Sequence, residues 1–247
     1  MYMKMAAYNG KNFFKSAFSV DCVIFGFDDG ILKVLLIKAD AEPFLGQWSL
    51  VGDLVHPEED LDEAAGRILT ERTGIDNVYL EQVKTFGKVG RHPEGRVITV
   101  AYFSLIKLRD YKLIPSNASN EAAWHSLNDV GHLAYDHTEI LTVCLERLRQ
   151  RVRTQPVGFE LLPRKFTLTD LQHLYEAILG KTLDKRNFRK KILSMNLLVD
   201  LDEMQTGVAH RPARLYSFDP VKYRKFNDEG MHFELKVPKR KKKIQEV

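Results

Sequence analysis

Residues 52–75 read GDLVHPEEDLDEAAGRILTERTGI and contain the signals of a loop, a helix and a glycine stop. Asp60 is a favoured N-cap residue, and Glu63 three positions later completes the pattern of a capping box. One face of the segment is apolar at helical spacing, through Leu61, Ala64, Ala65 and Ile68. Gly74 supplies the left-handed residue that commonly ends a helix. This stretch therefore predicts a loop followed by a capped amphipathic helix.

The composition is that of a soluble globular protein, with 44% hydrophobic and 28% charged residues in a chain of 247. No apolar run approaches the ~18 residues of a membrane span, and the N-terminus lacks the apolar region of a signal peptide. Cys22 and Cys144 lie far apart in apolar surroundings, which predicts buried thiols, and no CxxC metal signature is present. The chain is therefore expected in the reducing cytoplasm, away from membranes.

Positive charge is concentrated in the second half of the chain. From Pro156 onward there are 19 Lys and Arg against 12 Asp and Glu, whereas residues 1–155 contain 18 against 21. The asymmetry predicts two domains, of which the second faces a polyanion. A merely solvated basic surface is the alternative.

The first half has a strand-rich pattern around the predicted helix. Two β-rich runs flank Asp28-Asp29-Gly30, where Asp-Gly is a strong hairpin signal. Further strands follow the helix, divided by the turn-rich RHPEG at residues 91–95, and a last helix is predicted from about Asp136. Strands combined with a central helix and a closing helix amount to an α/β sandwich.

Residues 52–75 also resemble a Nudix box, the signature of enzymes that cleave nucleoside diphosphate derivatives. The family pattern is Gly, five residues, Glu, seven residues, and then Arg-Glu-apolar-x-Glu-Glu-x-Gly-apolar. The chain keeps this pattern at Glu59, Arg67, Leu69, Glu71, Gly74 and Ile75. It departs from the pattern at three positions, with Asp53 for Gly, Ile68 for the first helix Glu and Arg72 for the last. Further similarity over residues 20–150 implies an N-terminal Nudix α/β/α sandwich.

The three departures argue against catalysis. In active members of the resembled family, carboxylates at positions 68, 71 and 72 share a helix face and hold Mg²⁺, which neutralises the diphosphate and activates water. Here only Glu71 remains, and Arg67 one turn earlier can pair with it. We therefore predict no enzyme, no metal site and no cofactor, but a degenerate pocket retained to sense a ligand. A helix kept only as scaffold and a residual hydrolase are the alternatives.

The candidate effector-binding residues are Trp48, Asp53, Glu71, Arg91, Arg96, Trp124 and His137. A carboxylate at Asp53 without metal disfavours a diphosphate and favours a polyol, whereas guanidinium groups at Arg91 and Arg96 suit phosphates. The tryptophans could stack on a sugar or base, with core packing as the alternative. His137 lies at a predicted helix start, and the two loop arginines could instead form structural salt bridges.

Residues 157–219 have the pattern of a winged helix-turn-helix. Thr167 and Asp170 form a second capping box, and Asp184 caps the next helix, KRNFRKKILSM. In that helix the inward-facing residues are Phe188, Ile192 and Met195. The predicted wing strands are Leu197–Asp202 and Ala213–Phe218.

The cations and amides of this segment predict DNA binding. The first turn of a recognition helix enters the major groove, where Arg reads guanine and Asn reads adenine. Threonine hydroxyls can fix phosphates, and wing arginines can reach phosphates or the minor groove. The candidate DNA-binding residues are Thr167, Thr169, Lys185, Arg186, Asn187, Arg189, Lys190, Arg211 and Arg214. A solvated basic helix face is the alternative.

A degenerate Nudix domain joined to LYEAI (174–178) and DKRNFRKKI (184–192) resembles the Nudix-related transcriptional regulators of the NrtR family. The resemblance implies a bacterial homodimeric repressor that binds a palindromic operator in double-stranded DNA and responds to a small effector. Some members respond to ADP-ribose, and an arabinose-type group controls sugar use; Asp53 favours L-arabinose here, with ADP-ribose as the alternative. The expected organisation is an N-terminal arm (1–18), a Nudix-like effector domain (19–153), a winged helix-turn-helix domain (154–226) and a polybasic tail (227–247).

Overall fold

The computed structural model describes residues 16–114, 121–209, 211–229 and 233–235, which form two compact units. The first unit contains the described residues through Gly26 together with Lys33–Leu145, and the second contains Phe27–Leu32 and the described residues from Glu146 onward. The division falls inside helix α2 (His137–Thr154), which both units share. The predicted arm up to residue 15 and the predicted tail from residue 236 lie outside the described residues.

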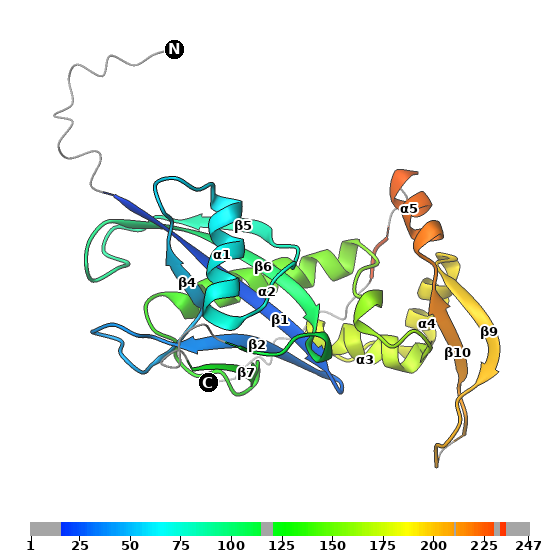
Figure 1. The fold of residues 1–247 in the computed structure, drawn as a ribbon. Coiled ribbons are helices and arrows are strands. Elements are labelled where there is room, and N and C mark those ends of the chain that lie inside the picture. The colour runs from blue at the N-terminus through cyan, green and yellow to red at the C-terminus, as the bar shows by residue number, and fades with distance from the viewer. Residues whose placement is uncertain (1–15, 115–120, 210, 230–232, 236–247) are drawn as a thin grey trace, which may run out of the picture. The chain divides into compact units, whose positions relative to one another are not determined.

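The first unit is built on a sheet with the strand order β3-β2-β1-β6-β5, in which β4 also pairs with β1 and β7 with β2 (Figure 1). The strands are β1 (Ala17–Asp28), β2 (Ile31–Lys38), β3 (Trp48–Ser49), β4 (Val51–Leu54), β5 (Glu81–Phe86), β6 (Val97–Lys107) and β7 (Ala122–Ser126). Helix α1 (Leu61–Thr73) precedes β5, and the 3-10 helix η2 (Leu108–Asp110) follows β6. The predicted α/β sandwich is confirmed.

The turn between β1 and β2 follows the Asp-Gly signal. Asp29 has φ 47° and Gly30 has φ 79°, so both central residues are left-handed. A two-residue turn of this kind matches the right-handed twist of the strands that it joins.

Neighbouring side chains of β1 point to opposite faces of the sheet, as strand geometry requires. The Cys22 thiol donates to the carbonyl oxygen of Ala65 in α1, with 3.8 Å between sulfur and oxygen. The adjacent Asp21 lies on the other face, where its Oδ1 is 3.6 Å from Nε2 of His137, the first residue of α2. Helix α1 and the beginning of α2 therefore cover opposite faces of the sheet.

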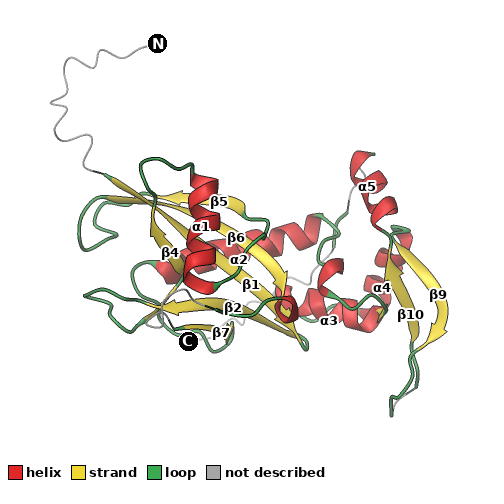
Figure 2. Ribbon diagram, in the orientation of Figure 1, coloured by secondary structure: helices red, strands yellow, loops and turns green. Residues whose placement is uncertain are grey.

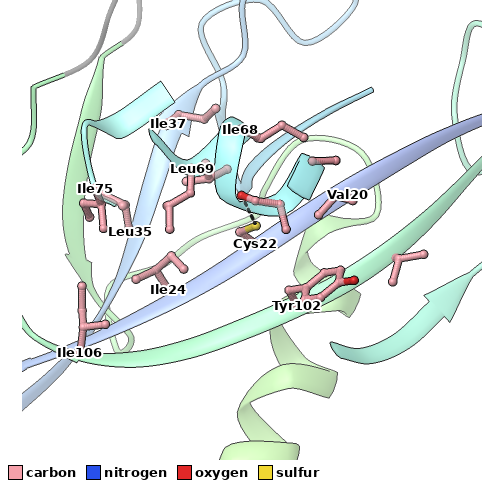
Figure 3. Close-up of a cluster of buried hydrophobic side chains, with 14 residues drawn as sticks. Val20, Cys22, Ile24, Leu35, Ile37, Ile68, Leu69, Ile75, Tyr102 and Ile106 are labelled. Atoms are coloured by element: carbon pink, nitrogen blue, oxygen red, sulfur yellow. Dashed lines mark hydrogen bonds between the residues drawn. The ribbon is translucent and has the colours of Figure 1, made fainter. Parts of the chain in front are cut away.

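Helix α1 has the predicted ends and the predicted buried face. The Asp60 backbone N–H donates to Glu63 Oε2 at 3.0 Å, and Gly74 has φ 77°, which confirms the capping box and the glycine stop. Figure 3 shows Ile68 and Leu69 of α1 among the side chains of a buried cluster that also includes Cys22 and Ile24 of β1.

The second unit contains the winged helix elements, which Figure 2 distinguishes by type. Its helices are η3 (Phe159–Leu161), α3 (Leu168–Leu179), α4 (Lys185–Ser194) and α5 (Pro220–Asp228), and its strands are β8 (Phe166–Thr167), β9 (Leu198–Met204) and β10 (Arg214–Phe218). The strands pair in the order β8-β10-β9. Both wing strands begin one residue later than predicted, within the usual uncertainty of strand ends.

The helix ends of this unit also agree with the sequence. Thr167 Oγ1 accepts a hydrogen bond from the Asp170 N–H at 3.1 Å, and Asp184 Oδ1 accepts one from the Asn187 N–H at 2.8 Å. Phe188 of α4 packs edge-on against the buried Tyr175 ring of α3, with 5.5 Å between ring centroids. Within the described ranges, the structure contains no helix of the length and apolarity that a membrane crossing needs.

Candidate functional site

Arg67 binds both carboxylates that remain from the Nudix pattern. Its Nε donates to Glu59 Oε2 at 2.9 Å, a terminal nitrogen donates to Glu59 Oε1 at 2.6 Å, and the other donates to Glu71 Oε2 at 3.0 Å. The pairing of Arg67 with Glu71 is thus confirmed. These bonds lower the pKa of Glu59 to about 2, because the guanidinium stabilises the ionised carboxyl. The remaining box carboxylates are held as ion pairs.

Arg72 joins two of the departures from the Nudix pattern. Its side chain is 18% exposed, and its guanidinium donates to Asp53 and, at 2.7 Å, to Asp40 Oδ2. The hydrogen bond from Arg72 lowers the pKa of Asp40. The expectation that Asp53 offers an unpaired carboxylate to a polyol is therefore wrong. The residue that replaces the box glycine is bound by the residue that replaces the last box glutamate.

Ile68 does not lie on a shared ligand-facing surface with positions 71 and 72. Its side chain has no exposed surface and belongs to the hydrophobic cluster between α1 and the sheet (Figure 3). The apolar stripe of the helix extends to this position, and packing rather than metal binding accounts for the isoleucine.

The box residues do not fit Mg²⁺, the metal that the Nudix pattern implies. Mg²⁺ needs several oxygen ligands, and at this site the carboxylates of Glu59 and Glu71 are engaged by Arg67, while Asp40 and Asp53 are engaged by Arg72. Nowhere in the described part of the chain do three or more Asp, Glu, His or Cys side chains form a group that could hold a metal ion.

A cavity of about 410 Å³ opens beside this helix. It is lined by residues of β1, β4 and β6, by Arg72 of α1, by the loops after β2 and before β6, and by residues at the beginning of α2. Four of the seven sequence candidates line it, namely Asp53, Arg91, Arg96 and His137. The cavity is the candidate effector-binding site.

The other three candidates are placed elsewhere, so their assignment to this cavity is corrected. Trp48 packs edge-on against His125, with 4.3 Å between ring centroids, because β3 and β7 both pair with β2. Trp124 packs on the backbone of β1, where a Cβ added at Gly26 would lie 2.8 Å from its ring. Glu71 is half exposed and bound by Arg67.

The inner wall of the cavity is formed by buried ionisable groups. His137 Nδ1 accepts a hydrogen bond from the Leu50 N–H at 3.0 Å, so the neutral imidazole carries its proton on Nε2, toward Asp21. Burial lowers the pKa of His137 and raises the pKa of Asp21. Sequence reasoning missed Asp21; the only signal was one acidic residue inside the apolar run SVDCVIF.

Arg91 is a buried part of this inner wall. Its side chain is 4% exposed, and it donates to both carboxylate oxygens of Asp136, at 2.8 and 2.6 Å, and to Thr99 Oγ1. The structural salt bridge that was the alternative for this arginine is therefore present. Arg96 is exposed at the cavity and donates to the Gly87 carbonyl oxygen.

An aromatic wall was also missed by sequence reasoning. Tyr135 lines the cavity together with His92, and the two rings stack with 5.1 Å between centroids and an interplanar angle of 14°. Phe44 contacts the same tyrosine, with 4.4 Å between ring centroids. Tyr135, and neither Trp48 nor Trp124, therefore places an aromatic ring on the cavity lining.

Protonation of His137 is expected to make the first unit less stable at acidic pH. As pH falls below about 6.5, the unfolded histidine binds a proton, whereas the folded one, with its lowered pKa, stays neutral, so the unfolded state is favoured. The free energy of unfolding should fall more steeply from pH 7.5 to 5.5 than in His137→Gln, with a difference in slope of at most about 1.4 kcal/mol per pH unit. The raised pKa of Asp21 contributes to the pH dependence of stability in both the unaltered protein and His137→Gln. Both tryptophans lie in the first unit, so urea denaturation followed by tryptophan fluorescence measures the free energy of unfolding of this unit. Equal slopes against pH in the unaltered protein and in His137→Gln would contradict the prediction.

The beginning of α4 presents polar side chains to solvent. Asp184 caps the helix, Phe188 and Ile192 are buried, and the exposed side chains are Lys185, Arg186, Asn187 and Lys190. This pattern is the one expected of a recognition helix that packs on one face and contacts DNA with its first turns.

Four of the other DNA-binding candidates form hydrogen bonds or ion pairs within the protein. The expectation that their side chains are available to DNA is therefore corrected. The Thr167 side chain is buried as the helix cap, and its hydroxyl is bonded to Asp170. Arg189 donates to Thr169 Oγ1 at 3.1 Å. Arg214 is paired with Asp200 at 2.6 Å. Arg211 is exposed, next to residue 210, which lies outside the described residues.

Comparison with known proteins identifies both units. Residues 15–147 match the NUDIX domain, and residues 158–218 match the NrtR DNA-binding winged helix domain. Over 218 residues the chain is 36% identical to a protein of Acinetobacter baylyi named ADPR responsive transcriptional repressor NtrR, covering 87% of this chain and 86% of that protein. A Nudix domain followed by a DNA-binding winged helix domain defines a class of two-domain transcription regulators.

Two solved structures agree with this class. NrtR of Shewanella oneidensis, in complex with a 27mer DNA, has a TM-score of 0.72 and 32% identity, covering 89% of this chain and 99% of that one. Its Nudix domain, in complex with ADP ribose, has a TM-score of 0.52 and 34% identity, covering 58% of this chain and 95% of that one. The chain belongs to the NrtR family. These relatives give no support to the arabinose-responsive group that the sequence favoured.

Proposed function

We propose that this chain is a transcriptional repressor whose Nudix domain binds ADP-ribose, and that this binding changes its affinity for operator DNA. The observation that carries the proposal is the cavity lined by the partly exposed Arg72 and the exposed Arg96, in a domain whose box carboxylates are bound by arginines. Guanidinium groups match diphosphate oxygens in geometry and charge. The ligand of the related Nudix domain and the name of the Acinetobacter relative support the same effector.

ADP-ribose replaces L-arabinose as the proposed effector for a physical reason as well. The preference for a sugar rested on Asp53 as an unpaired acceptor, and Arg72 binds that carboxylate. The same pair places a guanidinium on the cavity wall, where a phosphate can accept hydrogen bonds from it. A fixed cation at this position makes Mg²⁺ unnecessary for holding the diphosphate.

Helix α2 is the element that couples the binding of the ligand to the binding of DNA. Its first residue, His137, lines the cavity, and Arg149 further along donates to the Ile178 carbonyl oxygen of α3 at 3.1 Å. Helix α2 therefore connects a residue of the cavity with a residue that contacts α3, and α3 in turn packs against α4 through Tyr175 and Phe188. Such coupling acts equally in both directions, from ligand to DNA and from DNA to ligand.

ADP-ribose is expected to change the dissociation constant for DNA by about 5- to 150-fold, the usual range of coupling between two sites. The measurement is fluorescence anisotropy of a duplex obtained by in vitro selection with this protein, in the presence of EDTA. L-arabinose is the matched control and should leave the constant unchanged. An unchanged constant with ADP-ribose, or a response to L-arabinose alone, would refute the proposal.

The hydrolase alternative has a direct test. We expect ADP-ribose to remain intact after incubation with the protein and Mg²⁺, because the box carboxylates are paired with arginines. Appearance of AMP and ribose 5-phosphate would restore the enzyme interpretation.

The homodimer and the palindromic operator implied by the family resemblance stay predictions, to be checked by light scattering and by the symmetry of the selected DNA.

A further inference from the structure

Asp21 is an acidic residue in an otherwise apolar stretch of β1. Its neighbours Val20 and Cys22 have no exposed surface, and Asp21 itself is 4% exposed. One of its carboxylate oxygens, Oδ2, is buried and has no hydrogen-bond donor among the described residues. Buried polar atoms in native proteins are nearly always hydrogen-bonded, so a buried acceptor without a donor needs an explanation.

The surrounding side chains do not supply that donor. Arg91 comes nearest, with 3.9 Å from a terminal nitrogen to Oδ2, but its short hydrogen bonds go to Asp136 and Thr99. Nε2 of His137 lies 3.6 Å from the other carboxylate oxygen, Oδ1.

The backbone holds the carboxylate in place. A Cβ added at Gly52 would collide with Asp21 Oδ1, so the carboxylate fills the space that the glycine leaves. Asp21 and Gly52 both line the cavity. Asp21 is therefore held at the cavity wall with Oδ1 against Gly52, while its other oxygen, Oδ2, has no donor among the described residues.

The chemistry of this acceptor restricts what can bind to it. Phosphate oxygens carry no donor at neutral pH, and a second carboxylate would be repelled by Asp21. Hydroxyl groups donate without bringing a charge, and the vicinal hydroxyls of a ribose can both donate to one carboxylate. The exposed guanidinium groups of Arg96 and the partly exposed one of Arg72 line the same cavity and suit the phosphates of the same ligand.

We propose that Asp21 is the specificity residue of the effector site, and that it accepts hydrogen bonds from the vicinal hydroxyls of a ribose while the arginines bind the phosphates. This proposal rests on the proposed function, because it assigns a contact within the same cavity. Either the adenosine ribose or the terminal ribose of ADP-ribose can supply the hydroxyls, and the test separates the two.

Asp21→Asn is the decisive variant, because simple electrostatics predicts the opposite result. Removing a negative charge from the cavity should strengthen the binding of an anion, whereas loss of the hydroxyl acceptor should weaken it. We expect the dissociation constant for ADP-ribose, measured by isothermal titration calorimetry, to rise by about 10- to 100-fold. The matched control is Asp110→Asn, which makes the same change at an exposed position outside the cavity lining and should leave the dissociation constant for ADP-ribose unchanged.

Titration with ADP, which lacks the terminal ribose, identifies the hydroxyl donor. If Asp21→Asn weakens the binding of ADP as much as the binding of ADP-ribose, Asp21 binds the adenosine ribose. If the substitution leaves the affinity for ADP unaffected, Asp21 binds the terminal ribose. Should the variant fail to fold, the unaltered protein is titrated with ADP-ribose analogues that lack the vicinal hydroxyls of one ribose or the other, and one of them should lose the same 10- to 100-fold.

Equal affinity of Asp21→Asn and the unaltered protein for ADP-ribose would overturn this inference and leave the proposed function standing. Failure of the unaltered protein to bind ADP-ribose would instead refute the proposed function itself. In the analogue titration, equal binding of every analogue and ADP-ribose would overturn the inference.

Discussion

The double substitution Arg186→Ala with Asn187→Ala is expected to weaken binding of a selected operator duplex by at least about 30-fold, with little change in the melting temperature. Each bidentate contact of an arginine or asparagine with a base is worth about 1–3 kcal/mol, so two lost contacts give about 2–6 kcal/mol. Both side chains are exposed on the first turn of α4. The cap at Asp184 and the buried Phe188 hold the helix without them.

Fluorescence anisotropy on the duplex, at fixed ionic strength, measures this loss. The control is Lys88→Ala with Lys112→Ala, which removes two exposed cations from the first unit and should leave DNA affinity within about twofold. Arg189→Ala is a second comparison: it breaks the hydrogen bond to Thr169, so it should lower the melting temperature as well. Unchanged affinity in the Arg186 and Asn187 variant would show that α4 does not read the bases.

Replacement of Arg72 is expected to weaken ADP-ribose binding in EDTA by about 10- to 100-fold, the cost of a hydrogen bond to a charged group. The reason is that Arg72 is the partly exposed cation held toward the cavity by Asp40 and Asp53. Arg72→Gln removes the charge. Arg72→Glu also adds a carboxylate beside two existing ones, which together offer Mg²⁺ the oxygen ligands that it prefers.

The two variants should therefore differ in their response to metal. In calorimetric titrations, Mg²⁺ should restore part of the ADP-ribose affinity of Arg72→Glu and none of the affinity of Arg72→Gln. The unaltered protein should bind equally well with Mg²⁺ and with EDTA. A requirement for Mg²⁺ in the unaltered protein, or full affinity in both variants, would show that Arg72 does not take the place of the metal.

Several features of the site could be predicted because they depend on residues close together in the chain. The capping box at Asp60 and Glu63, the glycine stop at Gly74 and the pairing of Arg67 with Glu71 each involve atoms within one or two helical turns. Local backbone geometry brings such residues together in almost any surroundings. The N-cap and buried face of α4 were predictable for the same reason.

The errors concern residues that meet only through tertiary structure. Sequence reasoning treated Asp53 and Arg72 as two separate losses, and the fold pairs them across 19 positions. It assigned two tryptophans to a ligand because aromatic rings suit both roles, and strand pairing placed them in the packing around β2 and β1. It passed over Asp21, because one acidic residue in an apolar strand does not reveal which face of the sheet it occupies.

The sequence by itself determined that this chain has a Nudix domain with an altered box and a winged helix domain with a basic second helix. Those conclusions rest on periodicity, capping residues and a motif, which are properties of short segments. Only the tertiary structure decided which residues the altered positions of the box contact. Residues 52–54 and Arg72 line a cavity in which Arg72 is held by two carboxylates, and Asp21 lines the same cavity from another strand. Long-range pairing of this kind depends on how the sheet and helices pack, and no local pattern encodes it.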